Sequence, residues 1–403
     1  MNMSYLNNDD NLNDVMEELF NEKTLYRDKI KIEEEKKQFE EEKKQFEEEK
    51  KQFEEEKKQF EIIKNRTKND NYEEINKGEI LLSEEVNRFA IYPLKFSDIY
   101  EMYHQQLKCV WVAQEIDLSK DKDHFYKKLN DDERYFIKQI LAFFASADAI
   151  VNINIEENFL SKIKLREAQV AYRFQAAMED IHSEMYAEMI NNIIEDEDEK
   201  IKLYDAINHY DSIKLKKNWA EKWINNGNNL PIGQILIAFA IVEGVFFSGA
   251  FCAIYWIKHK PTKDKENLMP GLTSSNEFIA RDEGLHTNFA CMIYNNYINN
   301  KLDEIDVHIM FKEAVEIETN FITKSLPCNL IGMNSEKMIN YIKYVADLLL
   351  VSLNYKKLYN ITECPFDFMN AISLEGKVNF FENRPTQYQK AVSNNNFELN
   401  DDF

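Results

Sequence analysis

The chain has 403 residues, of which 44% are hydrophobic and 30% charged, and its formal net charge is -22. This length is sufficient for one large domain with an appended segment. The acidic balance argues against a nucleic-acid-binding surface, because phosphates repel an acidic protein. The five cysteines are scattered without a C-x-x-C pair, as is typical of reduced thiols in a cytoplasmic protein, and no glycine-rich nucleotide-binding motif is present.

Residues 1–78 differ from the rest of the chain because they are polar and contain few clustered aliphatic side chains. From Glu33 onward the unit EEEKKQF recurs in tandem and places a phenylalanine every seven residues. A coiled coil needs two apolar positions per heptad, and here the second position is Glu or Lys. Opposite charges four residues apart, such as Glu40 and Lys44, favour a long charged helix on its own. A weak coiled coil that binds a partner is the alternative.

From Ile80 onward the sequence predicts consecutive long helices with short loops, so the expected fold class is all-α. Asn130 and Thr273 begin polar segments that can cap the amino termini of two helices. We expect a helical domain over residues 79–376 and a flexible tail over residues 377–403 that is disordered when the protein is alone. The expected helices cover, in chain order, residues 96–116, 131–160, 165–194, 199–209, 215–226, 231–258, 274–298, 303–324 and 335–354.

The stretch from Ile235 to Ile257 is almost entirely apolar and is long enough to span a bilayer. Glu243 lies near its centre, where a charged side chain would cost about 2.5 to 3.5 kcal/mol in a membrane. Because the amino terminus MNMSYLNNDDNLND is polar and acidic, we expect no signal peptide, and we expect no second span. We therefore interpret this stretch as the buried central helix of a bundle and expect no membrane association.

A buried Glu243 must be paired, protonated or bound to a metal, and Asp148 in the apolar run FFASADAIV has the same requirement. Two Glu-x-x-His pairs offer matching groups, because residues three apart lie on one face of a helix. One acid from each of two helices and one Glu-x-x-His pair from each of two others is the ligand set of ferritin-like di-metal bundles. Carboxylates with two imidazoles favour iron or manganese over zinc. The predicted ligands are Asp148, Glu179, His182, Glu243, Glu283 and His286.

The spacing alone is weak support, because Glu101 and His104 form a third Glu-x-x-His pair. In a chain this rich in acids, such a pair is expected by chance. No isolated acid in an apolar run accompanies it, so we expect Glu101 and His104 to form a solvated helix face.

Tyr186 follows His182 by four residues and therefore lies on the same face of its helix. The simplest interpretation is that Tyr186, one of twenty tyrosines, only packs in the core. Beside an oxidising di-metal site, a phenol can instead lose an electron and a proton. Phe246, Phe247 and Phe251 are candidates for an apolar pocket that would protect the resulting radical.

The chain from Glu79 to Phe403 resembles the small, radical-generating subunit of class I ribonucleotide reductases of the eukaryotic and viral type. The resemblance rests on RFAIYPLKFSDIYEMY, VWVAQEIDLSKD, LAFFASADAIVNINI, FQAAMEDIHSEMY, AFAIVEGVFFSGAF, LMPGLTSSNEFIARDEGLH, CPFDFMNAISLEGKVNFFE and FELNDDF. It implies a ferritin-like bundle with extra helices, a homodimer and a large-subunit partner. It also implies two iron ions per chain rather than manganese, held by the six predicted ligands, and Tyr186 as the stable radical.

The resemblance further implies roles for residues that spacing leaves unassigned. Trp111 and Asp282 match residues that connect to the first metal-bound histidine, here His182, as a path for electrons and protons. Tyr388 matches the tail tyrosine that relays the radical to a cysteine of the large subunit, where ribonucleotides are reduced to deoxyribonucleotides. The last apolar side chains match the anchors that dock on the large subunit, namely Phe397, Leu399 and Phe403.

Two other functions stay open from the residues. A ferritin-like di-metal oxidase or oxygenase for a small or lipid substrate would need the six ligands, but it would need neither Trp111, Tyr388 nor the FELNDDF tail. An enzymatically silent partner of the large subunit would need the tail but not the ligands.

Overall fold

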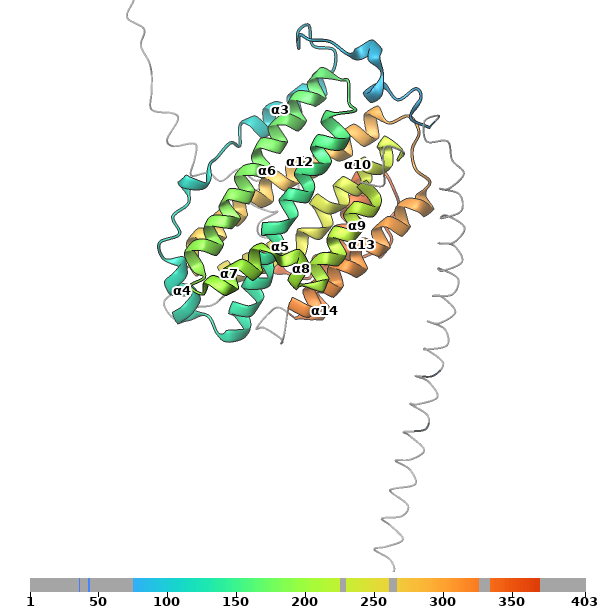
Figure 1. The fold of residues 1–403 in the computed structure, drawn as a ribbon. Helices are drawn as coiled ribbons and strands as arrows, with labels where there is room; N and C mark the ends of the chain where they lie inside the picture. The colour runs from blue at the N-terminus through green and yellow to red at the C-terminus, as the bar shows by residue number, and fades with distance from the viewer. Residues whose placement is uncertain are drawn as a thin grey trace, which may run out of the picture. The chain divides into compact units, whose positions relative to one another are not determined.

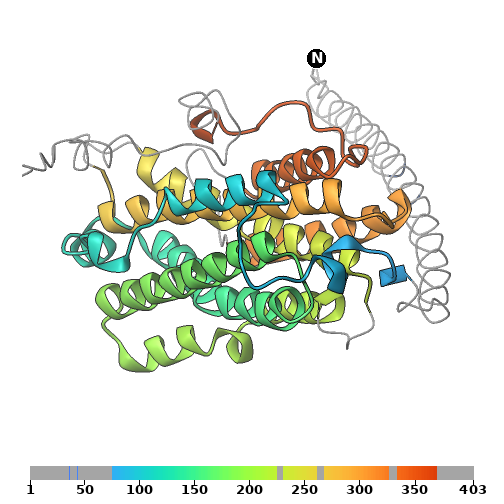
Figure 2. The ribbon, with the colours of Figure 1, turned by 90° about the horizontal axis from the view of Figure 1, so that it is seen from above.

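The computed structural model describes residues 75–224, 230–260, 267–325 and 334–369, together with Lys36 and Lys43. The contacts divide the chain into two units, Met1–Asp70 and Asn71–Phe403. All described residues except the two lysines belong to the second unit, whose helices are coloured in Figure 1 and Figure 2. The predicted helix over the heptad array lies outside the described residues, apart from Lys36 and Lys43, which are helical and exposed. The predicted tail also lies outside them.

The described part of the second unit is helical, with one isolated bridge between Asn87 and Leu165 as its only strand-like pairing. The all-α prediction is therefore confirmed. The helices are α3 (Ser97–Leu107), α4 (Asp121–Lys128), α5 (Asp131–Asn154), α6 (Arg166–Ile193), α7 (Glu197–Tyr204), α8 (Ala206–His209), α9 (Asp211–Ile224), α10 (Ile232–Ile241), α11 (Ser248–His259), α12 (Pro270–Tyr297), α13 (Glu304–Ser325) and α14 (Ser335–Ser352). The described part also contains two π-helical turns, η4 (Ile155–Leu160) and η5 (Val242–Phe246). It further contains three short 3-10 turns, η1 (Ile80–Leu82), η2 (Glu84–Val86) and η3 (Ala113–Glu115).

Two predictions near the start of the unit are wrong. The helix expected over residues 96–116 ends at Leu107, and the chain then runs irregularly so that Trp111 can turn its ring into the core, where it is 2% exposed. The short helix α4 was not predicted, because its average composition is strongly polar. Its buried positions Asp121, His124 and Phe125 follow a helical spacing that could have revealed it.

One predicted cap is confirmed and one is wrong. The Asn130 side chain accepts a hydrogen bond from the Glu133 amide at 2.9 Å, and Glu133 accepts one from the Asn130 amide at 3.0 Å, which forms a capping box. Helix α12 begins at Pro270 rather than near Thr273, because proline favours the first helical position.

Helix α4 supplies the cap that α12 needs. The Asp121 carboxylate accepts hydrogen bonds from the Gly271 and Leu272 amides at 3.0 and 2.6 Å. The Met269 amide donates to His124 Nδ1 at 3.0 Å. A Cβ on Gly271 would lie 2.8 Å from the Asp117 carbonyl oxygen, so only glycine permits this approach. The start of α12 is thus fixed by residues about 150 positions earlier in the chain.

The apolar run forms the central helix, in which α10, η5 and α11 follow one another without a break. Every residue from Ile232 to Ile257 is buried. Helices α9, α12, α13 and α14 pack around it, as Figure 1 shows for α10. The run is long and apolar enough to cross a membrane, but its apolar window is 100% buried inside the fold, as predicted for a core helix. A second segment, Asp131–Leu160, is also long and apolar enough by length and composition alone, and 71% of its apolar window is buried inside the fold.

The packing of the long helices determines where the site can form. Helix α5 packs along α6, α6 contacts α12, and α12 packs against both α10 and η5. In Figure 1, α5, α6 and α12 lie in the same half of the unit, beside α10. Four segments that are distant in sequence therefore meet around one interior volume.

Candidate metal centre

The six predicted ligands come from these four segments. Helix α5 contributes Asp148, α6 contributes Glu179 and His182, η5 contributes Glu243, and α12 contributes Glu283 and His286. Each of these six residues is at most 1% exposed. They form two groups, and Glu179 belongs to both. Within each group, the ligand atoms all lie within 4.8 Å of one another. The first group adds Asp148 and His182, and the second adds Glu243, Glu283 and His286.

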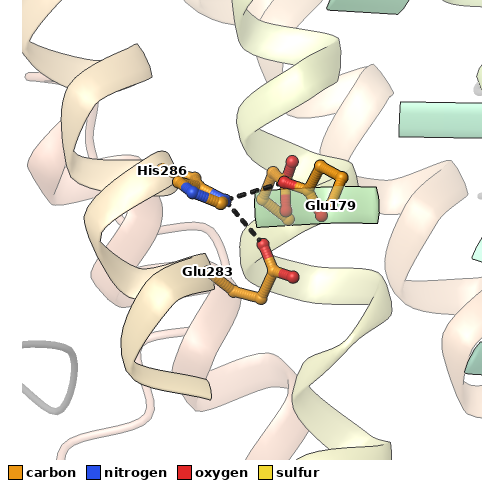
Figure 3. A group of neighbouring side chains, drawn as sticks. Glu179, Glu283 and His286 are labelled. Atoms are coloured by element: carbon orange, nitrogen blue, oxygen red, sulfur yellow. Dashed lines mark hydrogen bonds and ion pairs between the residues drawn. The ribbon is translucent and has the colours of Figure 1, made fainter. Parts of the chain in front are cut away.

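Glu179 and Glu283 each face both imidazoles. Figure 3 shows the two carboxylates directed at His286, whose Nδ1 lies 2.9 Å from Glu179 Oε1 and 3.0 Å from Glu283 Oε2. His182 Nδ1 lies 3.2 Å from the other oxygen of Glu179 and 3.0 Å from the other oxygen of Glu283. A carboxylate with one oxygen toward each of two sites can bridge two cations, and Asp148 and Glu243 are then placed to complete one site each.

Unpaired buried oxygens provide a test of whether this site fits cations. Among the described residues, neither oxygen of Asp148 and neither oxygen of Glu243 has a hydrogen-bond partner. Burial, followed by repulsion from neighbouring carboxylates, raises the pKa of both acids well above the usual range. An unpaired carboxylate in an apolar interior is costly. The four carboxylate charges equal the charge of two divalent cations, so the donor set fits a di-metal site.

The imidazoles respond to the same excess of negative charge. Burial by itself would lower the pKa of His286, but the carboxylates of Glu179 and Glu283 raise it to about 9. Burial likewise opposes protonation of His182, yet the carboxylates around it raise its pKa well above the usual value. Protons therefore balance part of the charge in the absence of metal, and metal binding would release them.

His182 also faces an acid that is not among the ligands. Its Nε2 lies 3.2 Å from Asp282 Oδ2, and the same oxygen accepts a hydrogen bond from Trp111 Nε1 at 2.8 Å. The ring of Trp111 is stacked against that of His182, with centroids 6.0 Å apart. A carboxylate that accepts from the second nitrogen of an imidazole fixes the orientation of the ring. Trp111, Asp282 and His182 thus form a continuous polar connection from the cluster outward.

Arg281 stabilises this connection. Its guanidinium donates to Asp282 Oδ1 at 3.0 and 2.8 Å and to the Cys109 carbonyl oxygen at 2.6 Å. Burial alone would raise the pKa of Asp282, but Arg281 and His182 lower it below the usual value, so the carboxylate stays ionised. The contact with Cys109 ties the segment that carries Trp111 to α12.

Tyr186 lies in an aromatic pocket. It is 1% exposed, and its ring stacks on Phe144 with centroids 4.5 Å apart. Phe144 in turn contacts Phe247 and Phe251. Among the described residues the phenol oxygen has no hydrogen-bond partner, and burial, followed by the charge of Asp148, raises its pKa well above the usual value.

The aromatic pocket differs in detail from the prediction. Phe144, which the sequence did not assign to the pocket, makes the direct stack on Tyr186. Phe246, which was assigned to it, makes its ring contact with Trp219 instead, at 5.1 Å. The reason is the π-helical turn, which changes the helical register just after Glu243 and turns the following residues to a different face.

The structure separates the remaining predicted residues from the cluster. Glu101 is exposed on α3, and the ring of its partner His104 packs edge-on against Tyr100 at 4.6 Å, as expected for a pair that arose by chance. The predicted relay tyrosine and docking anchors lie outside the described residues, namely Tyr388, Phe397, Leu399 and Phe403.

The fold and the cluster define a ferritin-like helical protein with a di-metal carboxylate site, and comparison with known proteins makes the assignment specific. Residues 88–365 match the profile of the family described as ribonucleotide reductase, small chain. The chain is 47% identical over 329 residues to the ribonucleoside-diphosphate reductase small chain of Vaccinia virus (strain Ankara), covering 81% of this chain and 100% of the relative. It is 48% identical over 330 residues to ribonucleoside-diphosphate reductase subunit M2 of Danio rerio, covering 81% and 83% respectively.

A solved structure supports the same assignment. The ribonucleotide reductase Rnr4 homodimer from Saccharomyces cerevisiae is similar with a TM-score of 0.67 and 32% identity, covering 79% of this chain and 99% of that chain. The chain belongs to the ribonucleotide reductase small-chain family, of the type found in viruses and eukaryotes. Its role is that of the small subunit of this oxidoreductase, and membership implies a large-subunit partner and a homodimer.

The cluster predicts a specific response of stability to metal. Ferrous ions added without oxygen should raise the Tm of the metal-free protein, because a ligand that binds only the folded state stabilises it by about 2.7 kcal/mol per site at 100 times its Kd. Glu179→Ala should lose most of this increase, since Glu179 belongs to both ligand groups. Glu101→Ala, which alters the pair outside the cluster, should keep it. Differential scanning calorimetry would measure the Tm, and an equal increase in both variants would contradict the assignment.

Proposed function

We propose that the cluster would hold two iron ions, which would supply oxidising chemistry with oxygen, and that Tyr186 is the residue placed to become the stable radical. The radical is then passed to the large subunit, which reduces ribonucleoside diphosphates to deoxyribonucleotides. The observation that carries the proposal is the position of a buried phenol, without a hydrogen-bond partner among the described residues, on the same helix as Glu179 and His182. Family membership supports it.

The proposed ligands are the six residues of the cluster, in two groups that share Glu179. Asp148 and His182 would complete one site, and Glu243 and His286 the other. Oxygen and imidazole donors of this kind serve both iron and manganese. We favour iron because Tyr186 can store the oxidising equivalent on the protein, which makes a metal-stored oxidant unnecessary.

Tyr186 must release an electron and a proton to become a radical. Asp148 is the acid whose charge acts most strongly on the phenol, so we propose it as the acceptor of that proton. Phe144 then shields the ring, and the absence of a hydrogen-bond donor to Oη among the described residues leaves the radical without a nearby source of hydrogen. Exclusion of water and donors is what would make the radical long-lived.

Trp111, Asp282 and His182 are proposed to carry the oxidising equivalent between the cluster and the protein surface. The Trp111 indole donates to Asp282, so an electron leaving the indole can be accompanied by movement of the Nε1 proton to that carboxylate. The relay would continue through Tyr388 to a cysteine of the large subunit. Phe397, Leu399 and Phe403 are the proposed anchors on that subunit, and the proposed location of the assembled enzyme is the cytoplasm.

We further propose that the chain is organised as a long charged helix or weak coiled coil over residues 1–78, a catalytic domain over residues 79–376 and a docking tail over residues 377–403. The heptad array supports the first segment, since its opposite charges four residues apart favour a solvated helix. The proposed catalytic domain contains the whole cluster, so neither terminal segment is needed to bind metal.

The radical assignment predicts an electron paramagnetic resonance signal. After reconstitution with ferrous ions and oxygen, the full chain should show a tyrosyl signal that Tyr186→Phe abolishes while two metals still bind. Tyr172→Phe is the matched control, because Tyr172 is also buried on α6 and its phenol oxygen is also unpartnered among the described residues. The signal should survive in the control. A signal that persists in Tyr186→Phe would sink the assignment.

The docking assignment predicts that removal of the anchors abolishes ribonucleotide reduction but leaves radical formation intact. The variant Phe397→Ala/Leu399→Ala/Phe403→Ala should keep the tyrosyl signal but lose at least about 99% of ribonucleotide reduction at limiting large subunit, because apolar anchors dominate such interfaces. Asp401→Ala/Asp402→Ala alters the same tail without removing an anchor and should retain most activity. Turnover would be assayed with purified large subunit. Equal turnover in the two variants would exclude the three residues as anchors.

A further inference from the structure

The ligand Glu243 lies in a helical segment with unusual geometry. The central helix is α-helical over Ile232–Ile241 and again over Ser248–His259, and the intervening turn Val242–Phe246 is π-helical. A π-helical turn has one more residue per hydrogen-bonded loop than an α-helix, and such turns are rare without an external reason. If this turn became α-helical, Glu243 would rotate relative to one of the two flanking segments of the central helix, since each residue turns a helix by about 100°.

A buried lysine from another helix holds the end of this turn. Lys216 on α9 is 3% exposed, and its Nζ donates to the Phe246 carbonyl oxygen at 2.8 Å. Its ammonium also lies 2.5 Å from Glu318 Oε2 on α13 and 3.5 and 3.9 Å from the ring centroids of Phe143 and Phe321. The charge is thus surrounded by one carboxylate, one carbonyl and two aromatic faces.

Lys216 and Glu318 depend on each other to stay charged. Burial raises the pKa of Glu318 to about 7 and lowers that of Lys216 to about 8. Replacing such a buried pair by apolar residues often leaves stability unchanged or improves it, so stability alone does not explain it. A fixed donor aimed at one backbone carbonyl provides a different reason, which is to define the backbone geometry at that point.

A glycine on the same helix leaves room for the pair. A Cβ on Gly249 would lie 2.5 Å from Glu318 Oε1 and 2.8 Å from the Ile322 side chain. Gly249 lies three residues after the end of the π-helical turn, so its lack of a side chain leaves room for Glu318 near the segment that Lys216 contacts. Phe143 connects the pair to the radical pocket as well, because its ring also contacts Phe247 at 5.2 Å.

We propose that Lys216, held in place by Glu318, is a positioning residue that fixes the π-helical turn and so orients Glu243 toward the second metal site. The inference rests on the proposed metal binding but adds residues that lie outside the ligand set, the Trp111 path and the tyrosine pocket. Helices α9 and α13 contribute no ligand, and this contact gives them a role in the chemistry.

Hydrogen exchange of the metal-free full chain tests the conformational part of the proposal. In Lys216→Met, amide exchange over residues 242–251 should accelerate by about tenfold or more, because the turn loses a charged hydrogen bond. Lys222→Met is the matched control, since Lys222 lies on the same helix but pairs with Glu313 in a partly exposed ion pair at 2.8 Å. Its exchange over residues 242–251 should remain that of the wild type.

Ferrous titration without oxygen tests the positioning part. In Lys216→Met the second iron should bind about 10- to 100-fold more weakly, as is typical when a group that orients a ligand is removed, while the first iron binds normally. Lys216→Met/Glu318→Leu removes the unpaired acid that Lys216→Met leaves behind. This double variant should regain the wild-type Tm. It should regain neither the wild-type exchange rate nor the wild-type affinity for the second iron, because the donor to the Phe246 carbonyl is still missing.

Three results would overturn the proposal. One is wild-type exchange and wild-type iron affinity in a folded Lys216→Met protein. Another is full recovery of both in the double variant, which would show that only the unpaired acid mattered. The third is faster exchange with unchanged iron binding. Exchange is measured without metal, so a wild-type protein that bound no iron would contradict the proposed function while leaving the exchange comparison readable.

Discussion

Four carboxylates share one buried interior volume, and the rest of the structure depends on how their charge is balanced. Asp148, Glu179, Glu243 and Glu283 are each at most 1% exposed. Repulsion among them would push the four segments apart unless cations or protons lay between them. Binding of cations at this cluster would therefore be thermodynamically linked to folding of the bundle interior.

The environment of each acid then differentiates its role. Glu179 and Glu283 face both imidazoles, whereas Asp148 and Glu243 have oxygens without partners among the described residues. Asp282 is equally buried, but Arg281 and Trp111 satisfy it, and it remains ionised beside His182. One helix turn further along α6, the ring of Tyr186 stacks on Phe144. Charge, hydrogen bonding and apolar packing thus change within a short distance, which would separate the proposed metal binding, proton transfer and radical storage.

Much of this arrangement follows from local sequence. Periodicity predicts α5, α6, α12 and the central helix, and the two isolated acids identify the same interior as the two Glu-x-x-His pairs. The pair Asn130 and Glu133 predicts the start of α5, because a capping box involves residues within a four-residue segment. Local signals are sufficient where the determining contacts lie within one or two helical turns.

The features that the sequence did not reveal depend on contacts between distant residues. Helix α12 begins at Pro270 because Asp121 caps it from α4. Phe144 rather than Phe246 covers Tyr186 because a π-helical turn changes the register after Glu243, and Lys216 contacts that turn from α9. A lysine in a polar helical pattern carries no local sign that it will be buried. The connection from Trp111 to His182 likewise became visible only through family resemblance, and the structure supplies its geometry.

The central claim is that this interior holds two metal ions bridged by two carboxylates. Anomalous X-ray diffraction at the iron absorption edge, from crystals of the full chain loaded with ferrous ions, tests it most directly. The account predicts two peaks, one next to Asp148 and His182 and the other next to Glu243 and His286, with Glu179 and Glu283 between them. A single peak, or iron bound only outside the cluster, would contradict it.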